Sequence, residues 1–156
     1  MKQIGLYNPK HSSSLIYLNE GDDISKWEEI GFRQFHDNNK ELLFIDWQPL
    51  FDWINSQTNT DIKFDIDLTG RRPKIVSPNI VEHCGAFASV CEIVEVQFFG
   101  LNIDEFGFAA TVQLSYMSWS GGTNGMNIGE VYYNHEFKQW DFVSAKMRTL
   151  TYRQKG

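Results

Sequence analysis

Two neighbouring stretches in the second half of the chain alternate between apolar and polar positions. Within residues 107–119, every second position from Phe108 to Tyr116 is apolar or aromatic, and a shorter alternation covers residues 93–99. A period of two is typical of a β-strand with one buried face. Residues 100–107 between them carry glycine at both ends and polar residues within, which predicts a hairpin with a long loop. We expect this hairpin to form the centre of an antiparallel sheet.

Further strand patterns follow the hairpin. Residues 128–134 and 140–152 are rich in apolar and aromatic side chains, and residues 134–139 between them have the composition of a turn. The glycine-rich residues 118–125 predict a loop. The C-terminal half is therefore predicted to be an antiparallel β-meander of about four long strands.

The first half contains shorter patterns. Residues 4–7 and 15–18 predict two brief strands or a hairpin, and the apolar residues 42–45 predict another short strand. Residues 62–68 alternate cleanly, so we expect a strand with apolar side chains on one side and Asp65 and Asp67 on the other.

Two helices are predicted in the same half. Asp23 is a suitable N-cap for a short helix whose apolar residues Ile24, Trp27 and Ile30 lie at helical spacing, with Phe35 as a further candidate. A second, longer helix should follow Asp46, with Pro49 in its first turn and an amide-rich end at residues 55–59. Its predicted buried face consists of Leu50, Phe51, Trp53 and Ile54.

Residues 77–85 permit two interpretations. The pair Ser77–Pro78 is a good helix start and Gly85 a good helix end, which predicts a third short helix. The same residues could instead begin a strand that runs into residues 87–99. The sequence leaves both alternatives open.

The order of these elements predicts the fold class. Two or three short helices lie mainly in the N-terminal half and the long strands in the C-terminal half, which favours an α+β fold over an alternating α/β fold. The length of 156 residues fits one globular domain over residues 1–156. We see neither a long apolar run nor a signal peptide, so we expect a cytoplasmic protein without a membrane partner.

The charge is uneven along the chain. The net charge is −6, yet residues 20–67 alone carry twelve acidic and four basic residues, a net −8. An acidic surface of this kind disfavours nucleic acid as a ligand, because phosphates require basic groups. It suits a cationic protein partner, whose approach it would steer. The alternative is that these residues form only a solvated face.

Motifs for catalysis or for metal and cofactor binding are not found. The four histidines are scattered, and the cysteines Cys84 and Cys91 are best explained as buried thiols in a reducing compartment. His83 and Cys84 are adjacent, but neighbouring residues of a strand point to opposite faces and do not form a catalytic pair. Asp65 and Asp67 could together bind a cation, although the outer face of an amphipathic strand is the commoner case. We expect no enzyme activity, no metal and no cofactor.

The aromatic content of 15% allows a second type of function. A helix followed by long curved strands is similar to the cone-shaped folds of the nuclear transport factor 2-like family, which would make the chain a small-ligand-binding protein or an enzyme. Rings on the inner face of a sheet are more often core than pocket. A homo-oligomer with an aromatic interface is a third alternative. The candidate pocket rings are Phe87, Phe98, Phe108, Tyr116, Trp119 and Trp140.

Three features together resemble the immunity proteins of bacterial toxin systems, and the contact-dependent growth-inhibition group in particular. They are the acidic residues 20–67, the Trp- and Phe-rich helix at residues 46–53, and the β-meander after Phe87. The resemblance implies specific binding to one cognate protein toxin, commonly a nuclease. It implies neither catalysis nor a cofactor.

If the partner is a basic toxin, acidic and aromatic side chains should form the contact surface. The carboxylates would pair with lysine and arginine of the toxin, and exposed rings would add buried area. An exposed sheet edge could also accept a strand of the partner. The predicted partner-binding residues are Asp61, Asp65 and Asp67, then Asp22, Asp23, Asp46 and Asp52, with the rings of Trp119 and Tyr132.

Overall fold

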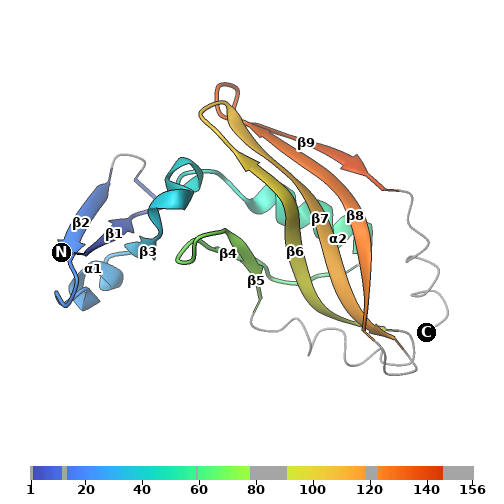
Figure 1. Cartoon of the computed structure of the whole chain (residues 1–156), viewed down its shortest axis with the longest axis horizontal. Coiled ribbons are helices and arrows are strands. Elements are labelled where there is room, and N and C mark those ends of the chain that lie inside the picture. Colours follow the sequence, from blue (N-terminus) through green and yellow to red (C-terminus); the bar gives the residue numbers. More distant parts are fainter. Residues whose placement is uncertain (1, 12–13, 59, 78–90, 119–122, 146–156) are drawn as a thin grey trace. The chain divides into compact units, whose positions relative to one another are not determined.

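The computed structural model describes residues 2–11, 14–58, 60–77, 91–118 and 123–145 (Figure 1). Its internal contacts divide the chain into two compact units. Unit 1 consists of Met1–Ile45 and Asp67–Lys74, and unit 2 consists of Asp46–Ile66 and Ile75–Gly156. The single domain expected over residues 1–156 stays a prediction, and each unit is described by itself.

Unit 1 contains a three-stranded antiparallel sheet with the order β2-β1-β3. These strands are β1 (Gln3–Tyr7), β2 (Leu15–Asn19) and β3 (Arg33–Phe35). The first two confirm the hairpin predicted from residues 4–7 and 15–18. Phe35, which we considered for the first helix, lies instead in β3. Its buried ring contacts the rings of Tyr7 and Tyr17 edge-on, with centroids 5.8 and 5.9 Å away.

The first predicted helix is present and short, as expected, but its N-cap differs from the prediction. Helix α1 covers only Ser25–Glu29, because Gly31 just beyond it adopts a positive φ of 103° and turns the chain into β3. Its N-cap is Ile24 and has no side-chain hydrogen bond, so the prediction of Asp23 as N-cap is wrong. Asp23 instead accepts a hydrogen bond from the backbone N–H of Ser25 at 2.9 Å.

The strand predicted at residues 42–45 is also wrong. The 3-10 helix η1 covers Asp37–Leu42, and the chain then turns. Leu42 and Leu43 are both buried, whereas neighbouring residues of a strand point to opposite faces. The buried Asn39 of η1 donates hydrogen bonds of 2.8 Å from Nδ2 to the carbonyls of Leu68 and Gly70. These bonds hold residues 68–70 to unit 1.

A two-stranded sheet consists of β4 (Asp65–Asp67) and β5 (Lys74–Val76). The predicted strand at residues 62–68 is thus shorter than its alternation suggested. The predicted apolar side is nevertheless the buried one, because Ile62, Ile66 and Leu68 are all buried. The reason for the difference is pairing: β5 has only three residues, so only three residues of the pattern acquire a ladder partner.

Unit 2 contains an antiparallel four-stranded meander with the order β6-β7-β8-β9. Helix α2 (Gln48–Thr58) contacts β8 and β9 (Figure 1). The strands are long and curved, and they confirm the predicted α+β class and meander. In the described part of the chain, no helix has the length and apolarity needed to cross a membrane. The strands are β6 (Cys91–Ile103), β7 (Gly107–Ser118), β8 (Thr123–Asn134) and β9 (Gln139–Ser144).

The loop predicted at residues 100–107 is much shorter in the structure. Strand β6 continues to Ile103, and Gly100 lies inside it at a register shift between Phe99 and Asn102. Its φ of +59° is the left-handed conformation that a β-bulge requires and that glycine adopts readily. The glycine pattern therefore marked a bulge, and residues 104–106 alone form the turn.

Several boundaries in the C-terminal half also differ from the prediction. Strand β8 begins at Thr123, inside the segment predicted as a glycine-rich loop, and reaches Asn134. Strand β9 ends at Ser144, and residues 146–152 of the longer predicted strand lie outside the described residues. Residues 78–85, Cys84 and Trp119 lie outside them as well.

The inner face of the sheet packs against α2 through aromatic rings. Trp47 contacts Phe108 and Trp140 at centroid distances of 5.6 and 5.5 Å, and Trp53 stacks on Phe142 at 5.0 Å. The start of the helix is as predicted, because the Asp46 carboxylate accepts a hydrogen bond from the N–H of Gln48 at 3.1 Å. The predicted helix face is confirmed by the burial of Leu50, Phe51, Trp53 and Ile54.

Candidate functional site

The strand register defines an outer face of the sheet, opposite α2. Ala109 pairs with Asn102 on one side and with Tyr132 on the other, and Tyr132 pairs with Asp141. These four residues form one row across β6, β7, β8 and β9. The next row, which includes Phe108 and Trp140, belongs to the inner face that carries the ring contacts with Trp47. Side chains of the first row therefore point away from α2.

An open pocket of about 290 Å³ lies at this row. We call it the outer-face pocket. The row contributes Asn102, Ala109, Tyr132 and Asp141, and the β6–β7 turn contributes Asp104, Phe106 and Gly107. The neighbouring strand residues Phe108, Tyr133 and Asn134 complete the lining. Ala109 stands between larger neighbours, and its single methyl group leaves space above the sheet. The pocket thus combines rings and carboxylates in a shallow, solvent-accessible hollow.

The β6–β7 turn is fixed by the side chain of Asp104. Its Oδ1 accepts hydrogen bonds from the backbone N–H groups of Phe106 and Gly107, at 2.8 and 3.0 Å. A turn held in this way presents Phe106 outward, and 74% of this residue is exposed. Asp104 thereby contributes a negative charge to the pocket and also positions one of its rings.

Tyr132 is the second ring of the pocket. Its hydroxyl donates a 2.7 Å hydrogen bond to Oε2 of Glu130, which lies two residues earlier on the same face of β8. This hydrogen bond is the main cause that raises the pKa of Tyr132 above its usual value. Asp141 is exposed beside it and has no hydrogen-bond or ion-pair partner in the described part of the chain.

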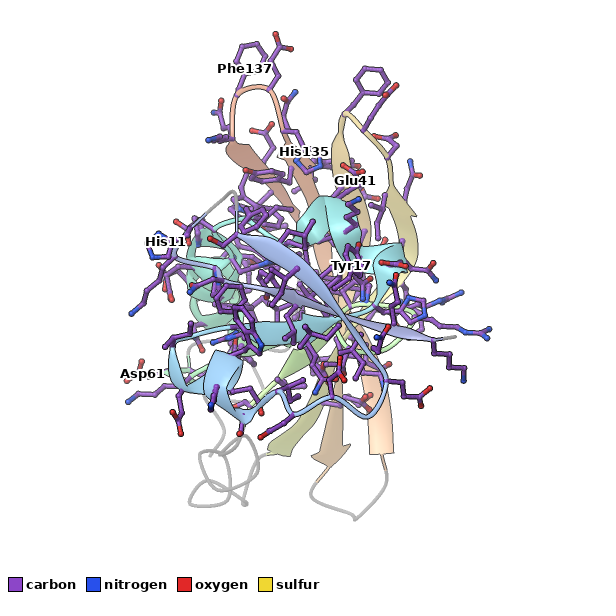
Figure 2. All side chains as sticks on the ribbon, turned by 90° about the vertical axis from the view of Figure 1, so that its left-hand side faces the viewer. His11, Tyr17, Glu41, Asp61, His135 and Phe137 are labelled. Carbon is purple, nitrogen blue, oxygen red and sulfur yellow. The ribbon has the colours of Figure 1, made fainter. Side chains whose placement is uncertain are left out.

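The same end of the sheet carries a further exposed ring. Phe137 lies in the β8–β9 turn, is 69% exposed and points away from the sheet (Figure 2). The two turns are joined by a hydrogen bond of 3.0 Å from the N–H of His135 to the carbonyl of Phe106. Glu105 and Glu136 sit next to the rings in sequence and are also exposed. Aromatic and acidic side chains are thus close together at the tips of two hairpins.

The predicted partner-binding residues of unit 1 are held by local hydrogen bonds. Asp22 accepts from the N–H of Asn19, and Asp23 from that of Ser25, both at 2.9 Å. The carboxylate of Asp67 accepts from the hydroxyl and the N–H of Thr69, at 2.6 and 2.9 Å. The Thr69 hydroxyl is the main cause that lowers the pKa of Asp67. These three carboxylates therefore accept hydrogen bonds within local turns of the backbone.

The predicted residues of unit 2 lie in different places. Asp46 and Asp52 are brought together at the start of α2, where both accept hydrogen bonds from Gln48. Because α2 covers the inner face of the sheet, these two carboxylates do not share a face with Tyr132. Asp65 and Asp67 both lie in β4, and Asp61 lies in the segment that precedes this strand.

Sequence reasoning found Tyr132 but missed most of the outer-face pocket. Asp141 lies nine residues beyond Tyr132, on the far side of a turn, and only the ladder between β8 and β9 makes them neighbours. Glu130 could have been found, because it precedes Tyr132 by two residues in a strand. Asp104 and Phe106 were assigned to a long loop, which obscured their position at the end of a tight hairpin.

The rings proposed for a ligand pocket inside the sheet lie in a packed cluster where the structure describes them. Phe98 and Phe108 contact each other at 5.2 Å, and Phe108 and Trp140 at 6.0 Å, with Trp47 against all three. Phe87 and Trp119 lie outside the described residues, as does the side chain of Tyr116. Within the described part, no group of three or more His, Cys, Asp or Glu side chains could hold a metal ion.

Comparisons with protein-family models, with curated proteins and with solved structures find no match to this chain. The function must therefore be inferred from the chain's own side chains. Among these, the outer-face pocket is the place where exposed rings and carboxylates converge in a hollow. Its lining includes two carboxylates, those of Asp104 and Asp141, and no lysine, arginine or histidine.

Proposed function

We propose that this protein is an immunity protein that binds a basic toxin, namely a nuclease, and blocks its active site. The observation that carries the proposal is the outer-face pocket, which Tyr132 and Phe106 line together with Asp104 and Asp141. In this proposal the protein acts in the cytoplasm, as a bound inhibitor that turns over no substrate.

The exposed rings support a protein partner. Phe106 and Phe137 expose 74% and 69% of their surface at the tips of two joined hairpins. Burying such rings in a complex supplies much of the binding energy in typical interfaces, where a few aromatic anchors dominate. Exposed aromatic groups rimmed by polar residues are also a common mark of an interaction site.

The charge supports a basic partner. The chain carries a net −6, and the residues that line the outer-face pocket include two carboxylates and no lysine or arginine. Opposite charge accelerates encounter and fixes the orientation of two proteins. A nuclease must present basic groups to grip phosphate, so an acidic protein surface can occupy the same place.

The proposal is tested with the protein encoded immediately upstream of this chain in its genome. Cells that produce this neighbour alone should stop growing, and co-production of the wild-type chain should restore growth and give a complex that purifies intact. A Phe106→Ala/Tyr132→Ala double variant should fail in both respects. Ile30→Ala removes an apolar side chain of unit 1 that is 64% exposed, between the exposures of Tyr132 and Phe106, and it should protect as well as the wild type.

Two outcomes of this experiment would contradict the proposal. One is that no complex forms even at low salt. The other is that the chain protects cells without binding the neighbour, which would indicate catalysis. Charge reversal at Asp65 and Asp67 tests the surface predicted from the sequence: if it weakens the complex while the double variant does not, the contact lies at β4.

A further inference from the structure

We propose that the outer-face pocket accepts one arginine side chain of the partner protein, with the guanidinium group between the rings of Tyr132 and Phe106 and in contact with the carboxylate of Asp141. This inference rests on the proposed function in one respect, namely that the arginine belongs to a toxin. It adds the chemical group that the pocket recognises.

The size of the pocket limits the choice of ligand. Sites for cofactors and drug-sized molecules usually enclose about 300–1,000 Å³. The outer-face pocket holds about 290 Å³ and is open to solvent, so it offers little enclosure to such a ligand. A single long side chain that enters from a bound protein fits this volume, because the partner itself closes the open side.

The lining of the pocket determines the charge of the ligand. Asp104 and Asp141 both contribute carboxylates, and Glu130 adjoins them through its hydrogen bond to Tyr132. No lysine, arginine or histidine is among the residues that line the pocket. Phosphate and carboxylate ligands would therefore be repelled, and a cation would be attracted.

The rings favour arginine over lysine. A planar guanidinium group stacks on aromatic faces and is more weakly hydrated than an ammonium group. It also presents donors in a rigid fork that matches a carboxylate. Asp141 suits this role because its carboxylate has no partner in the described part of the chain. Asp104 is already engaged by the turn through Oδ1, so we assign it a supporting charge.

The test uses the full chain and two capped peptides, Gly-Arg-Gly and Gly-citrulline-Gly. Citrulline has the shape of arginine without its charge. Titration followed by amide NMR should give saturable shifts for the arginine peptide, confined to Asn102, Ala109, Tyr132, Asp141 and the β6–β7 turn. The citrulline peptide should bind at least about tenfold more weakly, because it lacks the charge-assisted hydrogen bonds.

Matched variants locate the contact. Asp141→Asn should weaken arginine-peptide binding about tenfold, and Tyr132→Leu should do the same by removing the ring. Glu95→Gln neutralises an exposed carboxylate elsewhere on the same sheet and should leave the affinity unchanged. Both site residues are exposed, so their replacement should not unfold the chain, which the unchanged remainder of the spectrum would verify.

The inference is overturned if citrulline and arginine peptides bind alike, if the shifts spread over all acidic segments, or if Asp141→Asn binds as well as the wild type. Its failure is separable from that of the proposed function. If Asp141→Asn and Tyr132→Leu still form the toxin complex normally, the arginine inference is disproved and the proposed immunity function stands. If the chain binds the arginine peptide at this site but does not bind the upstream-encoded protein, the arginine inference stands and the proposed immunity function is disproved.

Discussion

Gly107 and Gly125 lie on neighbouring strands, β7 and β8, but differ in the space around their Cα atoms. A Cβ at Gly107 would meet the carbonyl of Tyr133, whereas at Gly125 the nearest atom, the carbonyl of Leu114, is 3.9 Å away. We predict that Gly107→Ala lowers the free energy of unfolding by about 1–3 kcal/mol, because the ladder beside the outer-face pocket must shift. Gly125→Ala should stay within about 0.5 kcal/mol of the wild type.

Urea denaturation followed by tryptophan fluorescence measures both changes. Equal stabilities of the two variants would contradict the close approach of β7 and β8 at Gly107. Since Gly107 also lines the outer-face pocket, the same variant should perturb the amides of the β6–β7 turn.

Asp67 gives a prediction on pH. Its pKa is lowered in the folded chain by the hydrogen bonds from Thr69, so its stabilising contribution is present above the ordinary pKa and disappears as the pH falls through the folded value. Asp67→Ala should cost about 1 kcal/mol at pH 7. The difference between variant and wild type should be constant down to about pH 5 and shrink below about pH 4.

Thermal unfolding at a series of pH values checks this prediction. Thr69→Val keeps the carboxylate but removes the hydroxyl donor, and it should bring the pKa of Asp67 back toward its ordinary value. If the stability difference between Asp67→Ala and the wild type grew as the pH fell, the prediction would be contradicted.

Helix α2 is the element on which unit 2 is packed. Trp47, just before the helix, is buried and contacts Phe98, Phe108 and Trp140. We predict that Trp47→Ala destabilises the chain by about 3–5 kcal/mol, since it removes a large ring from a packed cluster.

The control for this prediction is Phe137→Ala, at a ring that is 69% exposed, which should change stability by about 0.5 kcal/mol or less. Chemical denaturation of both variants is the measurement. If Trp47→Ala were as stable as Phe137→Ala, the inner face of the sheet would be a ligand cavity rather than a packed core. That result would favour the alternative of a small-ligand-binding protein or enzyme with a cone-shaped fold.

The elements show how far the sequence alone could predict this fold. The long strands β7 and β8 were identifiable because one face is buried, and α2 because Asp46 and four apolar residues mark its start and its face. Residues 42–45 were misassigned because a short apolar run has no period that separates a strand from a buried turn. The bulge at Gly100 is not predictable from the sequence, because a glycine in a bulge and a glycine in a turn are alike in sequence.

The candidate site was less predictable for a related reason. The residues of the outer-face pocket come from four strands, and their neighbourhood is set by strand register, which local patterns do not encode. Tyr132 and Asp141 meet only across the β8–β9 ladder. The excess of negative charge in residues 20–67 drew attention to that segment instead, although Asp22, Asp23 and Asp67 are engaged in local turns.

For the molecule as a whole, charge and rings have separable roles. In the proposed function, the net charge of −6 steers a basic partner toward the chain, and this contribution should weaken as salt screens it. The exposed rings at the hairpin tips should instead control how slowly the complex dissociates.

The most direct test is a calorimetric measurement of the dissociation constant for the complex with the upstream-encoded protein, made at several salt concentrations. We predict that binding of the wild-type chain weakens as salt rises. The Phe106→Ala/Tyr132→Ala variant should bind at least about 100-fold more weakly at every salt concentration, as expected for the loss of two anchor residues. A double variant that binds as tightly as the wild type would contradict the central claim that this face of the sheet binds the toxin.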